Sequence, residues 1–381
     1  MKVRVLNKDN KYGGRNIDVT FGQSSFETPN RIATQKDYYA ASSLPHNIII
    51  KNPASEFVTS FDNPSLAAFL TGNGSFSRRH ARIVTQSLDM MRYFPTISTI
   101  QFPTGVRITK DQLWFFDKVQ MGPCNMISIP PFEYKNIAEY KDVIKHYSDV
   151  AIFRGQEAMP ILQLSSELET FKLEFAALRE LNNENGLCKI IGFAYANPFK
   201  YPHQFYEIYK NREEEIWYHV FGVPRTPRGK KKNGVAHIHE LQNWGLDTFS
   251  PEVRHISPKA VVYLIKKSQT TKPEEVQCRR FDSATLGIFK EPDWIRRYKQ
   301  EIHCNCPVCK GKDLSSFKDA YIHELDGSFN ANLLRDADKV HELVSGSGEF
   351  VVSREAIKSD DLPTYYKEKE FTKDRVIPPG V

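Results

Sequence analysis

Residues 159–198, MPILQLSSELETFKLEFAALRELNNENGLCKIIGFAYANP, decide the fold that the sequence predicts. MPILQLSS is a short apolar run that ends in polar residues, as a buried strand would. Residues 167–181 then have apolar residues at helical spacing without Gly or Pro, and CKIIGFAYANP is a second strand-like run. A strand, a helix and a strand in this order predict two parallel strands joined by a crossover helix.

The same alternation continues on both sides of this unit. The strand-like runs are NIIIKNP (47–53), CNMISIPP (124–131) and WYHVFGVP (217–224), and the helix-like runs are AEYKDVIKHY (138–147), YPHQFYEIYKNREEE (201–215) and SPKAVVYLIKKS (257–268). Repeats of this kind over roughly 250 residues predict an α/β fold of the (β/α)8 barrel type. A doubly wound sheet is the alternative, but no G-x-G-x-x-G follows a first strand.

Composition limits the class of protein. The 381 residues are 40% hydrophobic and 26% charged, as in ordinary soluble globular proteins. No apolar run is long enough to cross a bilayer, and the N-terminus lacks the apolar core of a signal peptide. We therefore expect a cytoplasmic protein without membrane partners, in which six reduced cysteines serve metal binding or packing. The net charge of +6 permits a nucleic-acid partner.

Three of the six cysteines lie in HCNCPVCKGKD, residues 303–313. The spacing C-x-C-x₂-C supplies three thiolates from one tight loop, and a histidine would complete the tetrahedral shell that Zn²⁺ prefers. A closed shell leaves no position for substrate, so the predicted zinc is structural. The spacing alone does not decide whether His303, His323 or His341 is the fourth ligand, and three packed cysteines without metal are the alternative.

Several motifs together resemble the tRNA-guanine transglycosylase family. CNCPVC (304–309), AYIHEL (320–325) and VHEL (340–343) resemble the family's zinc module, in which a later histidine completes the site. The resemblance implies the ligands Cys304, Cys306, Cys309 and His341. SFETPN (25–30), LTGNGSF (70–76), PILQLSS (160–166), HVFGVP (219–224) and FDSATL (281–286) resemble further family motifs and occur in family order.

The resemblance implies the chemistry and the catalytic residue. The family replaces a guanine in nucleic acid by a 7-deazaguanine through a covalent aspartyl intermediate, and FDSATL would supply Asp282 as the nucleophile. We expect Asp282 at the end of a strand on the active face of the barrel. A turn aspartate is the alternative reading. GLDTFSP (245–251) is a rival match that has Ser250 in place of the aspartate.

Substrate contacts are expected from the same motifs. Asn73 and Phe76 would hydrogen-bond and stack on the base, Gln163 would bond a purine edge, and Gly192 would admit the base close to the backbone. The chain departs from the family where Gly72 and Asn73 replace one aspartate and Ser128 replaces a second base-binding one. These departures imply altered base recognition or loss of activity.

Two basic segments flank the expected pocket. RTPRGKKKNG (225–234) contains Lys230, Lys231 and Lys232, and SRRHAR (77–82) contains Arg78 and Arg79. Such loops would lie along the phosphates of a nucleic acid. The alternative is a loop that contacts only solvent.

The divergence from the tRNA enzymes favours the DNA-directed 7-deazaguanine transglycosylases of bacteria and phages. We therefore expect base exchange in DNA. Exchange in tRNA and a non-catalytic nucleic-acid-binding paralogue are the alternatives.

The predicted organisation has three parts. Residues 1–300 would form the catalytic barrel with an N-terminal β extension, residues 301–350 the zinc module packed on it, and residues 351–381 a C-terminal extension. Nothing in the sequence fixes the oligomeric state, and a homodimer is compatible with it.

Overall fold

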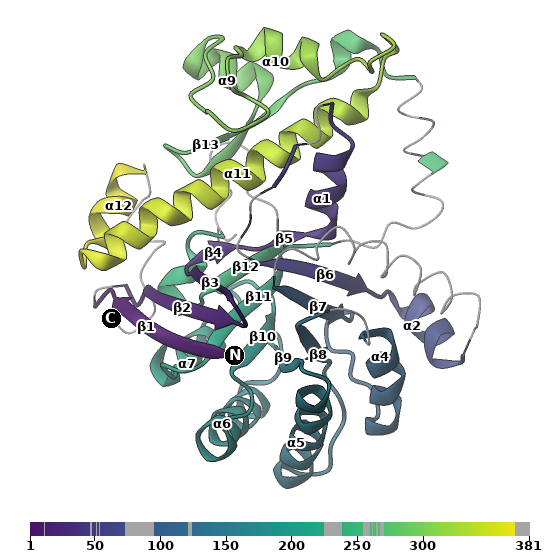
Figure 1. The fold of residues 1–381 in the computed structure, drawn as a ribbon, viewed down its shortest axis with the longest axis vertical. Coiled ribbons are helices and arrows are strands. Elements are labelled where there is room, and N and C mark those ends of the chain that lie inside the picture. The colour runs from purple at the N-terminus through teal and green to yellow at the C-terminus, as the bar shows by residue number, and fades with distance from the viewer. Residues whose placement is uncertain are drawn as a thin grey trace.

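The computed structural model describes residues 1–369 apart from 11, 46–47, 51, 53, 73–94, 121–123, 225–237, 254–259, 261, 264–265 and 267–269 (Figure 1). Its centre is a sheet of nine parallel strands. The strands, in chain order, are β4 (Asn30–Arg31), β5 (Ala33–Thr34), β6 (Ser55–Ser60), β7 (Thr96–Gln101), β8 (Met126–Ile129), β9 (Glu157–Gln163), β10 (Ile190–Ala194), β11 (Trp217–Val223) and β12 (Thr248–Pro251).

The sheet closes on itself. β4 pairs with β12 and β5 pairs with β6, and only Ile32 separates β4 from β5. The Ile32 backbone N–H still donates to the Phe249 carbonyl oxygen over 2.8 Å, so one continuous segment forms both ends of the sheet. The result is a barrel of eight staves, which confirms the predicted (β/α)8 fold.

Helices connect successive strands on the outside of the barrel. They are α1 (Gln35–Ser42), α2 (Asn63–Leu70), α4 (Leu113–Gln120), α5 (Ile137–Phe153), α6 (Leu168–Asn185) and α7 (Pro202–Asn211), with short 3-10 turns η1 (Lys110–Gln112) and η2 (Leu241–Trp244). α6 realises the predicted pattern: Phe171, Phe175 and Leu178 are buried on one face. Gly186 ends the helix with φ +66°, a left-handed conformation that glycine adopts without strain.

One predicted strand is wrong. NIIIKNP was expected to form a buried strand, but residues 48–50 are not in a strand, and the polar segment SEFVTS forms β6 a few residues later. The apolar run attracted the prediction because β-branched residues favour strands. The observed strand carries charged and hydroxyl side chains, which such a pattern does not recognise.

An antiparallel sheet closes the N-terminal end of the barrel. It consists of β1 (Lys2–Lys8), β2 (Arg15–Phe21) and β3 (Ser24–Glu27). Ile17, Val19 and Phe26 from this sheet join one apolar cluster with Met126 and Trp217, which lie at the beginnings of barrel strands. The opposite, C-terminal end is therefore the one at which a substrate could enter.

The C-terminal third of the chain forms a module between β12 and the helix α11 (Ala331–Lys358). β12 is the eighth strand of the barrel when β4 and β5 are counted as one. It contains η3 (Pro273–Glu275), the hairpin β13 (Arg279–Asp282) and β14 (Gly287–Lys290), and the helices α9 (Glu291–Tyr298) and α10 (Leu314–Ala320). α11 contacts α1 and β4 and crosses the flank of the barrel diagonally (Figure 1), so it takes the place of the eighth barrel helix.

The helix α11 also revises the predicted division of the chain. It continues through residue 350, where we expected the zinc module to end, so no structural boundary lies there. α12 (Leu362–Glu368) follows and buries Leu362, Tyr365 and Tyr366. The beginning of the predicted C-terminal extension is thus part of the packed fold rather than a surface tail, and residues 370–381 lie outside the described residues.

A buried ion pair ties the N-terminal sheet to the barrel. Arg15 on β2 donates from Nε and Nη2 to the carboxylate of Asp247, over 2.8 and 2.6 Å, and both side chains are buried. The Tyr218 backbone N–H donates to the same carboxylate. Burial disfavours the charged guanidinium, but Asp247 outweighs it and raises the pKa of Arg15 above its ordinary value.

Replacing Asp247 by Asn should therefore destabilise the fold strongly. The amide cannot balance the buried guanidinium, and breaking a buried pair from one side typically costs about 3–5 kcal/mol. Denaturant unfolding measures the loss. Glu169→Gln, which breaks the exposed Lys172–Glu169 pair, is the matched control and should change stability by less than about 0.5 kcal/mol. An Asp247→Asn protein as stable as the wild type would contradict this role.

Candidate functional site

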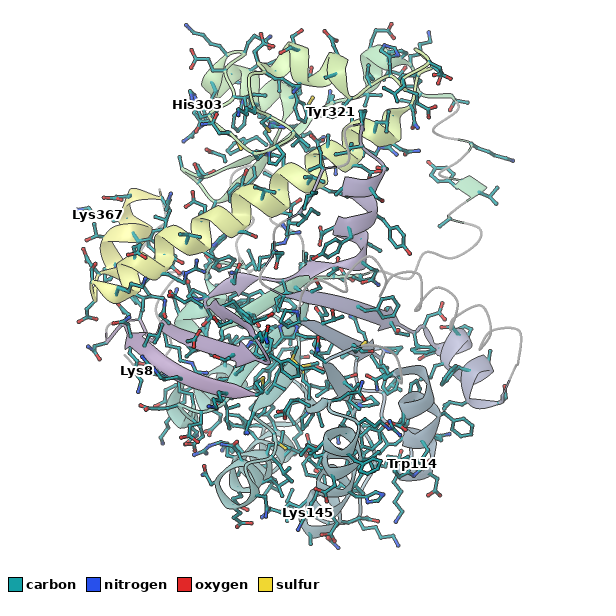
Figure 2. The ribbon with its side chains drawn as sticks, viewed as in Figure 1. Lys8, Trp114, Lys145, His303, Tyr321 and Lys367 are labelled. Carbon is teal, nitrogen blue, oxygen red and sulfur yellow. The ribbon has the colours of Figure 1, made fainter. Side chains whose placement is uncertain are left out.

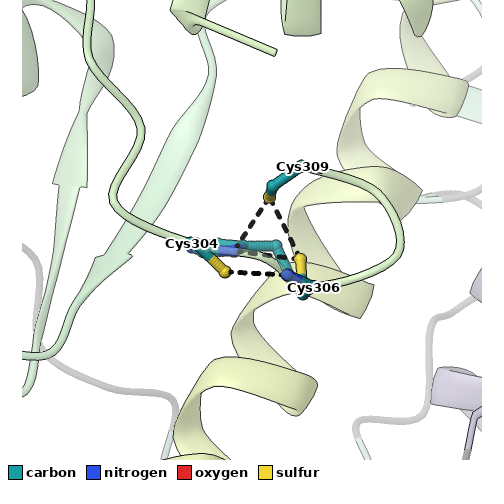
Figure 3. Close-up of side chains that lie close together, drawn as sticks. Cys304, Cys306 and Cys309 are labelled. Carbon is teal, nitrogen blue, oxygen red and sulfur yellow. Dashed lines mark hydrogen bonds between the residues drawn. The ribbon is translucent and has the colours of Figure 1, made fainter. Parts of the chain in front are cut away.

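Four side chains of the module converge on one point. Cys304, Cys306 and Cys309 lie on the loop between α9 and α10 (Figure 3), and His341 lies on α11. Their ligand atoms all lie within 4.8 Å of one another. Cys309 Sγ is 3.1 Å from Cys306 Sγ and 3.3 Å from His341 Nδ1. The predicted ligand set is therefore confirmed as a cluster that could hold a metal ion.

The cluster fits a tetrahedral metal such as zinc. Three thiolates and one imidazole are the donors of structural zinc sites. The Cys309 backbone N–H donates to the Cys306 carbonyl oxygen over 2.9 Å, which forms the tight turn that aims both sulfurs inward. His341 Nδ1 faces the sulfurs, and Nε2 accepts from the Phe281 backbone N–H over 3.1 Å and lies 3.4 Å from the Phe281 carbonyl oxygen. With a metal on Nδ1, the proton would be on Nε2 and the carbonyl oxygen would accept it, which orients the ring.

The other two candidate histidines are not in the cluster. The His303 side chain is exposed and lies 3.5 Å from the Glu301 carboxylate. His323 is on the surface, where its backbone forms a bridge with Phe329. His341 is therefore the histidine of the cluster, because α11 brings it next to the cysteine loop.

Arg280 is a functional residue that the sequence analysis overlooked. Its guanidinium is fully buried, stands over the Phe317 ring, and donates from Nη2 to Cys309 Sγ over 2.6 Å. A divalent ion bound by three thiolates and a neutral histidine carries a net negative charge, which this cation offsets. The available signal was an arginine in a short strand-like run just upstream of the cysteine cluster.

Replacing Cys306 by Ser should remove the metal and lower stability. Metal binding is coupled to folding, so we expect less than stoichiometric zinc by elemental analysis and an unfolding temperature lower by about 5 °C or more. Cys188→Ser is the control, because Cys188 is a buried cysteine outside the cluster, and it should retain one zinc per chain. Metal-free wild type with unchanged stability would rule out the site.

The expected position of the nucleophile is wrong. Asp282 ends β13, which pairs with β14 and not with a barrel strand. Its carboxylate accepts hydrogen bonds from Thr285 Oγ1 and Tyr298 Oη, each over 2.8 Å. The hairpin packs through Leu286 in one apolar cluster with α12, and Phe281 lines a small pocket with Pro251 at the C-terminal end of β12. This matches the alternative reading of a turn aspartate.

The rival motif GLDTFSP is the one that forms a barrel strand. Its Asp247 holds Arg15 at the N-terminal end, whereas Ser250 lies near the C-terminal end of β12 with a buried hydroxyl that has no hydrogen-bond partner among the described residues. Of the two rival motifs, the one in a barrel strand therefore has Ser250 where FDSATL has Asp282.

The described substrate residues are already engaged within the protein. The Ser128 hydroxyl donates to Gln120 Oε1 over 3.0 Å and accepts from the Ile100 backbone N–H. Gln163 Nε2 donates to the Val106 carbonyl oxygen over 3.1 Å. A Cβ on Gly192 would lie 3.1 Å from Met159 Sδ, so the missing side chain makes room for Met159.

The remaining predicted residues cannot be placed. Asn73, Phe76, Arg78, Arg79, Lys230, Lys231 and Lys232 all lie outside the described residues. Their assigned roles stay predictions.

The interior of the barrel contains a polar chain that the sequence analysis missed. Trp217 Nε1–H donates to Thr248 Oγ1 over 2.7 Å, and the same hydroxyl lies 2.9 Å from His219 Nδ1. His219 Nε2 lies 3.3 Å from Glu56 Oε1, and both side chains are fully buried. If the Thr248 hydroxyl donates its hydrogen bond to Nδ1, the proton of the neutral imidazole is on Nε2 and faces the carboxylate.

Glu56 is held in an unusual state for a carboxylate. Neither of its oxygens has a hydrogen-bond partner in the part of the chain that the structure describes. Each strand of such a barrel is staggered by about one residue relative to its neighbour. The strand registers combined with this stagger place Ser128, Gly192 and Ser250 at the same height along the barrel axis as Glu56. These residues come from four different strands, so no local sequence pattern brings them together.

Comparisons with known proteins give likeness of fold only. No family model matches the chain, and no curated protein matches its sequence. Among solved structures, a putative fructose-1,6-biphosphate aldolase from Coccidioides immitis covers 85% of this chain and 92% of its own at 8% identity, with a TM-score of 0.40.

Two further solved structures are less similar in coverage. The YdjI aldolase from Escherichia coli K12 covers 64% of this chain and 82% of its own at 11% identity, with a TM-score of 0.35. A D-psicose 3-epimerase covers 58% and 83% at 10% identity, with a TM-score of 0.30. At these values none of them bears on the chemistry of this chain. In the described residues, no helix combines the length and apolar character needed to span a bilayer.

Proposed function

We propose that this chain is a base-exchange transglycosylase that replaces guanine in DNA with a 7-deazaguanine. The observation that supports this most is the position of the Cys₃His cluster, between the eighth strand and the eighth helix of a (β/α)8 barrel. Fold, ligand set and chain order together agree with the resemblance to the guanine transglycosylases. The activity would be that of a pentosyl-transferring glycosyltransferase with a structural zinc ion.

The reaction needs a carboxylate beside the anomeric carbon. Such a group forms a glycosyl ester as guanine leaves through an oxocarbenium-like transition state. Asp282 lies on the outer hairpin with its oxygens engaged, so it does not suit this role. We assign the role to Glu56, which β6 directs into the barrel interior next to His219.

The state of Glu56 supports this assignment. A buried carboxylate without hydrogen bonds costs several kcal/mol unless a neighbouring charge or a function compensates it. His219 Nε2 lies 3.3 Å from Glu56 Oε1 without hydrogen-bond geometry. A buried polar group without a hydrogen-bond partner calls for an explanation, and a catalytic role is one. His219 would accept or return a proton as the incoming base replaces guanine.

A second candidate function has its own supporting observation. Ser250 lies in a barrel strand where FDSATL has its aspartate, and Glu56 lies within a barrel interior that also contains Ile161 and Phe221. If a serine replaces the catalytic aspartate and apolar side chains fill the interior, the chain would bind nucleic acid without exchanging its bases. In either case the target base must leave the base stack to reach the barrel mouth. For both candidate functions, tRNA is the alternative to DNA.

Exchange of radiolabelled guanine, or of a 7-deazaguanine, into DNA and tRNA offered side by side tests the proposal. Wild type should label DNA, and Glu56→Gln should lower the rate at least 1,000-fold, because an amide of the same shape cannot act as the carboxylate. Asp282→Asn, the matched control, should stay within about threefold of wild type. All three proteins should retain zinc and their secondary structure.

Each outcome has a defined meaning. Full exchange by Glu56→Gln would contradict the assignment of the carboxylate. Loss of exchange only in Asp282→Asn would restore the nucleophile implied by the sequence. No exchange by wild type on either polymer, with retained binding, would favour the non-catalytic candidate.

A further inference from the structure

A pocket lies at the end of the barrel opposite the mouth. It has a volume of about 410 Å³ and is lined by Lys8, Arg15, Tyr209, Lys210, Arg212 and Glu214. Lys8, labelled in Figure 2, belongs to β1 of the closing sheet, and Arg212 lies between the end of α7 and the start of β11. This places the pocket beside the N-terminal ends of the strands, away from the candidate site inside the barrel.

Among the described residues, Arg212 has no carboxylate partner. No hydrogen bond or ion pair joins its guanidinium to another described residue, and its Nη1 is buried without an acceptor. The neighbouring cations differ in this respect. The Arg15 guanidinium is held by Asp247 and by the Glu213 and Ile216 carbonyl oxygens, and Lys8 pairs with Glu214. An unsatisfied buried donor is costly, so Arg212 stands out.

The guanidinium of Arg212 is nevertheless held in a fixed place. It stacks over the Tyr209 ring at 4.8 Å. Gly245, with φ +78°, packs against it so closely that a Cβ would lie 2.8 Å from Arg212 Cδ and 3.1 Å from Nη1. A Cβ on Gly13 would likewise overlap the Tyr209 ring. Two glycines thus make room for a stacked and preorganised cation.

The charge around Arg212 is unbalanced. Burial and the nearby Arg15 both lower the pKa of Arg212, because they disfavour a second positive charge there. The exposed Lys210 adds another cation at the same pocket, and Glu214 is engaged with Lys8. A bound anion would satisfy the free guanidinium donors and remove the repulsion between the arginines.

We propose that this pocket binds the phosphate group of a small molecule. A planar guanidinium offers two parallel donors to phosphate oxygens, and the lysines add point charges. The volume exceeds that of a phosphate ion and falls in the range of small-ligand pockets, so the pocket has room for a nucleoside monophosphate. The site is independent of base exchange, since no residue of the barrel interior lines it.

Thermal unfolding and calorimetry of the full-length holoprotein test the proposal. Inorganic phosphate and guanosine monophosphate are the two probes, each compared with sodium chloride at equal ionic strength. A ligand that binds the folded state raises the unfolding temperature with concentration. We expect this for wild type, with tighter binding of the nucleotide if the rest of the pocket contributes and equal binding if only the phosphate is recognised.

Two variants separate the site from general charge effects. Arg212→Met keeps the stem against Tyr209 and should weaken phosphate binding at least tenfold, while leaving phosphate-free stability unchanged or higher. Arg179→Met, which removes a nearby guanidinium already paired with Glu213, should bind like wild type. Phosphate that stabilises no more than chloride, or that binds Arg212→Met as tightly as wild type, would overturn the proposal.

Discussion

The contact between the cysteine loop and α11 determines how the C-terminal third of the chain is attached. Cys304, Cys306 and Cys309 come from the loop, and His341 comes from the helix that completes the barrel against α1 and β4. A metal at this point would cross-link the loop to α11 in addition to the apolar core that the module shares with the barrel. Arg280 adds to the same centre, because its buried charge has the thiolates as its nearest anions. The shape of the module and the course of α11 therefore depend on one cluster of four ligands.

Much of the fold follows from sequence periodicity, with failures that have physical causes. The units around β9, α6 and β10 were predictable because their strands are apolar on both faces and their helix has one continuous apolar face. β6 was not, because SEFVTS has polar residues on both faces: Glu56 faces the barrel interior, and the Ser55 hydroxyl is bonded to Tyr38 of α1. The barrel interior, rather than intrinsic propensity, determines that strand.

The two candidate centres differ in how far the sequence predicts them. The metal ligands were predictable because three of them are adjacent in the chain and their spacing has a direct geometric meaning. The nucleophile was not, because short motifs such as FDSA and GLDTFSP do not state which of them forms a barrel strand. Strand pairing decides this: GLDTFSP pairs with β11 and β4, whereas FDSA ends an outer hairpin. Glu56 and His219 meet only because barrel closure brings β6 and β11 face to face across the interior, which no local pattern records.

The central claim is that a carboxylate inside the barrel forms the covalent bond to nucleic acid. Its most direct test is to trap the wild-type protein on DNA under denaturing conditions, digest the adduct and locate the modified residue by mass spectrometry. Our account predicts a glycosyl ester on the peptide that contains Glu56. An adduct on another residue, or binding to DNA without any denaturant-resistant adduct, would contradict it.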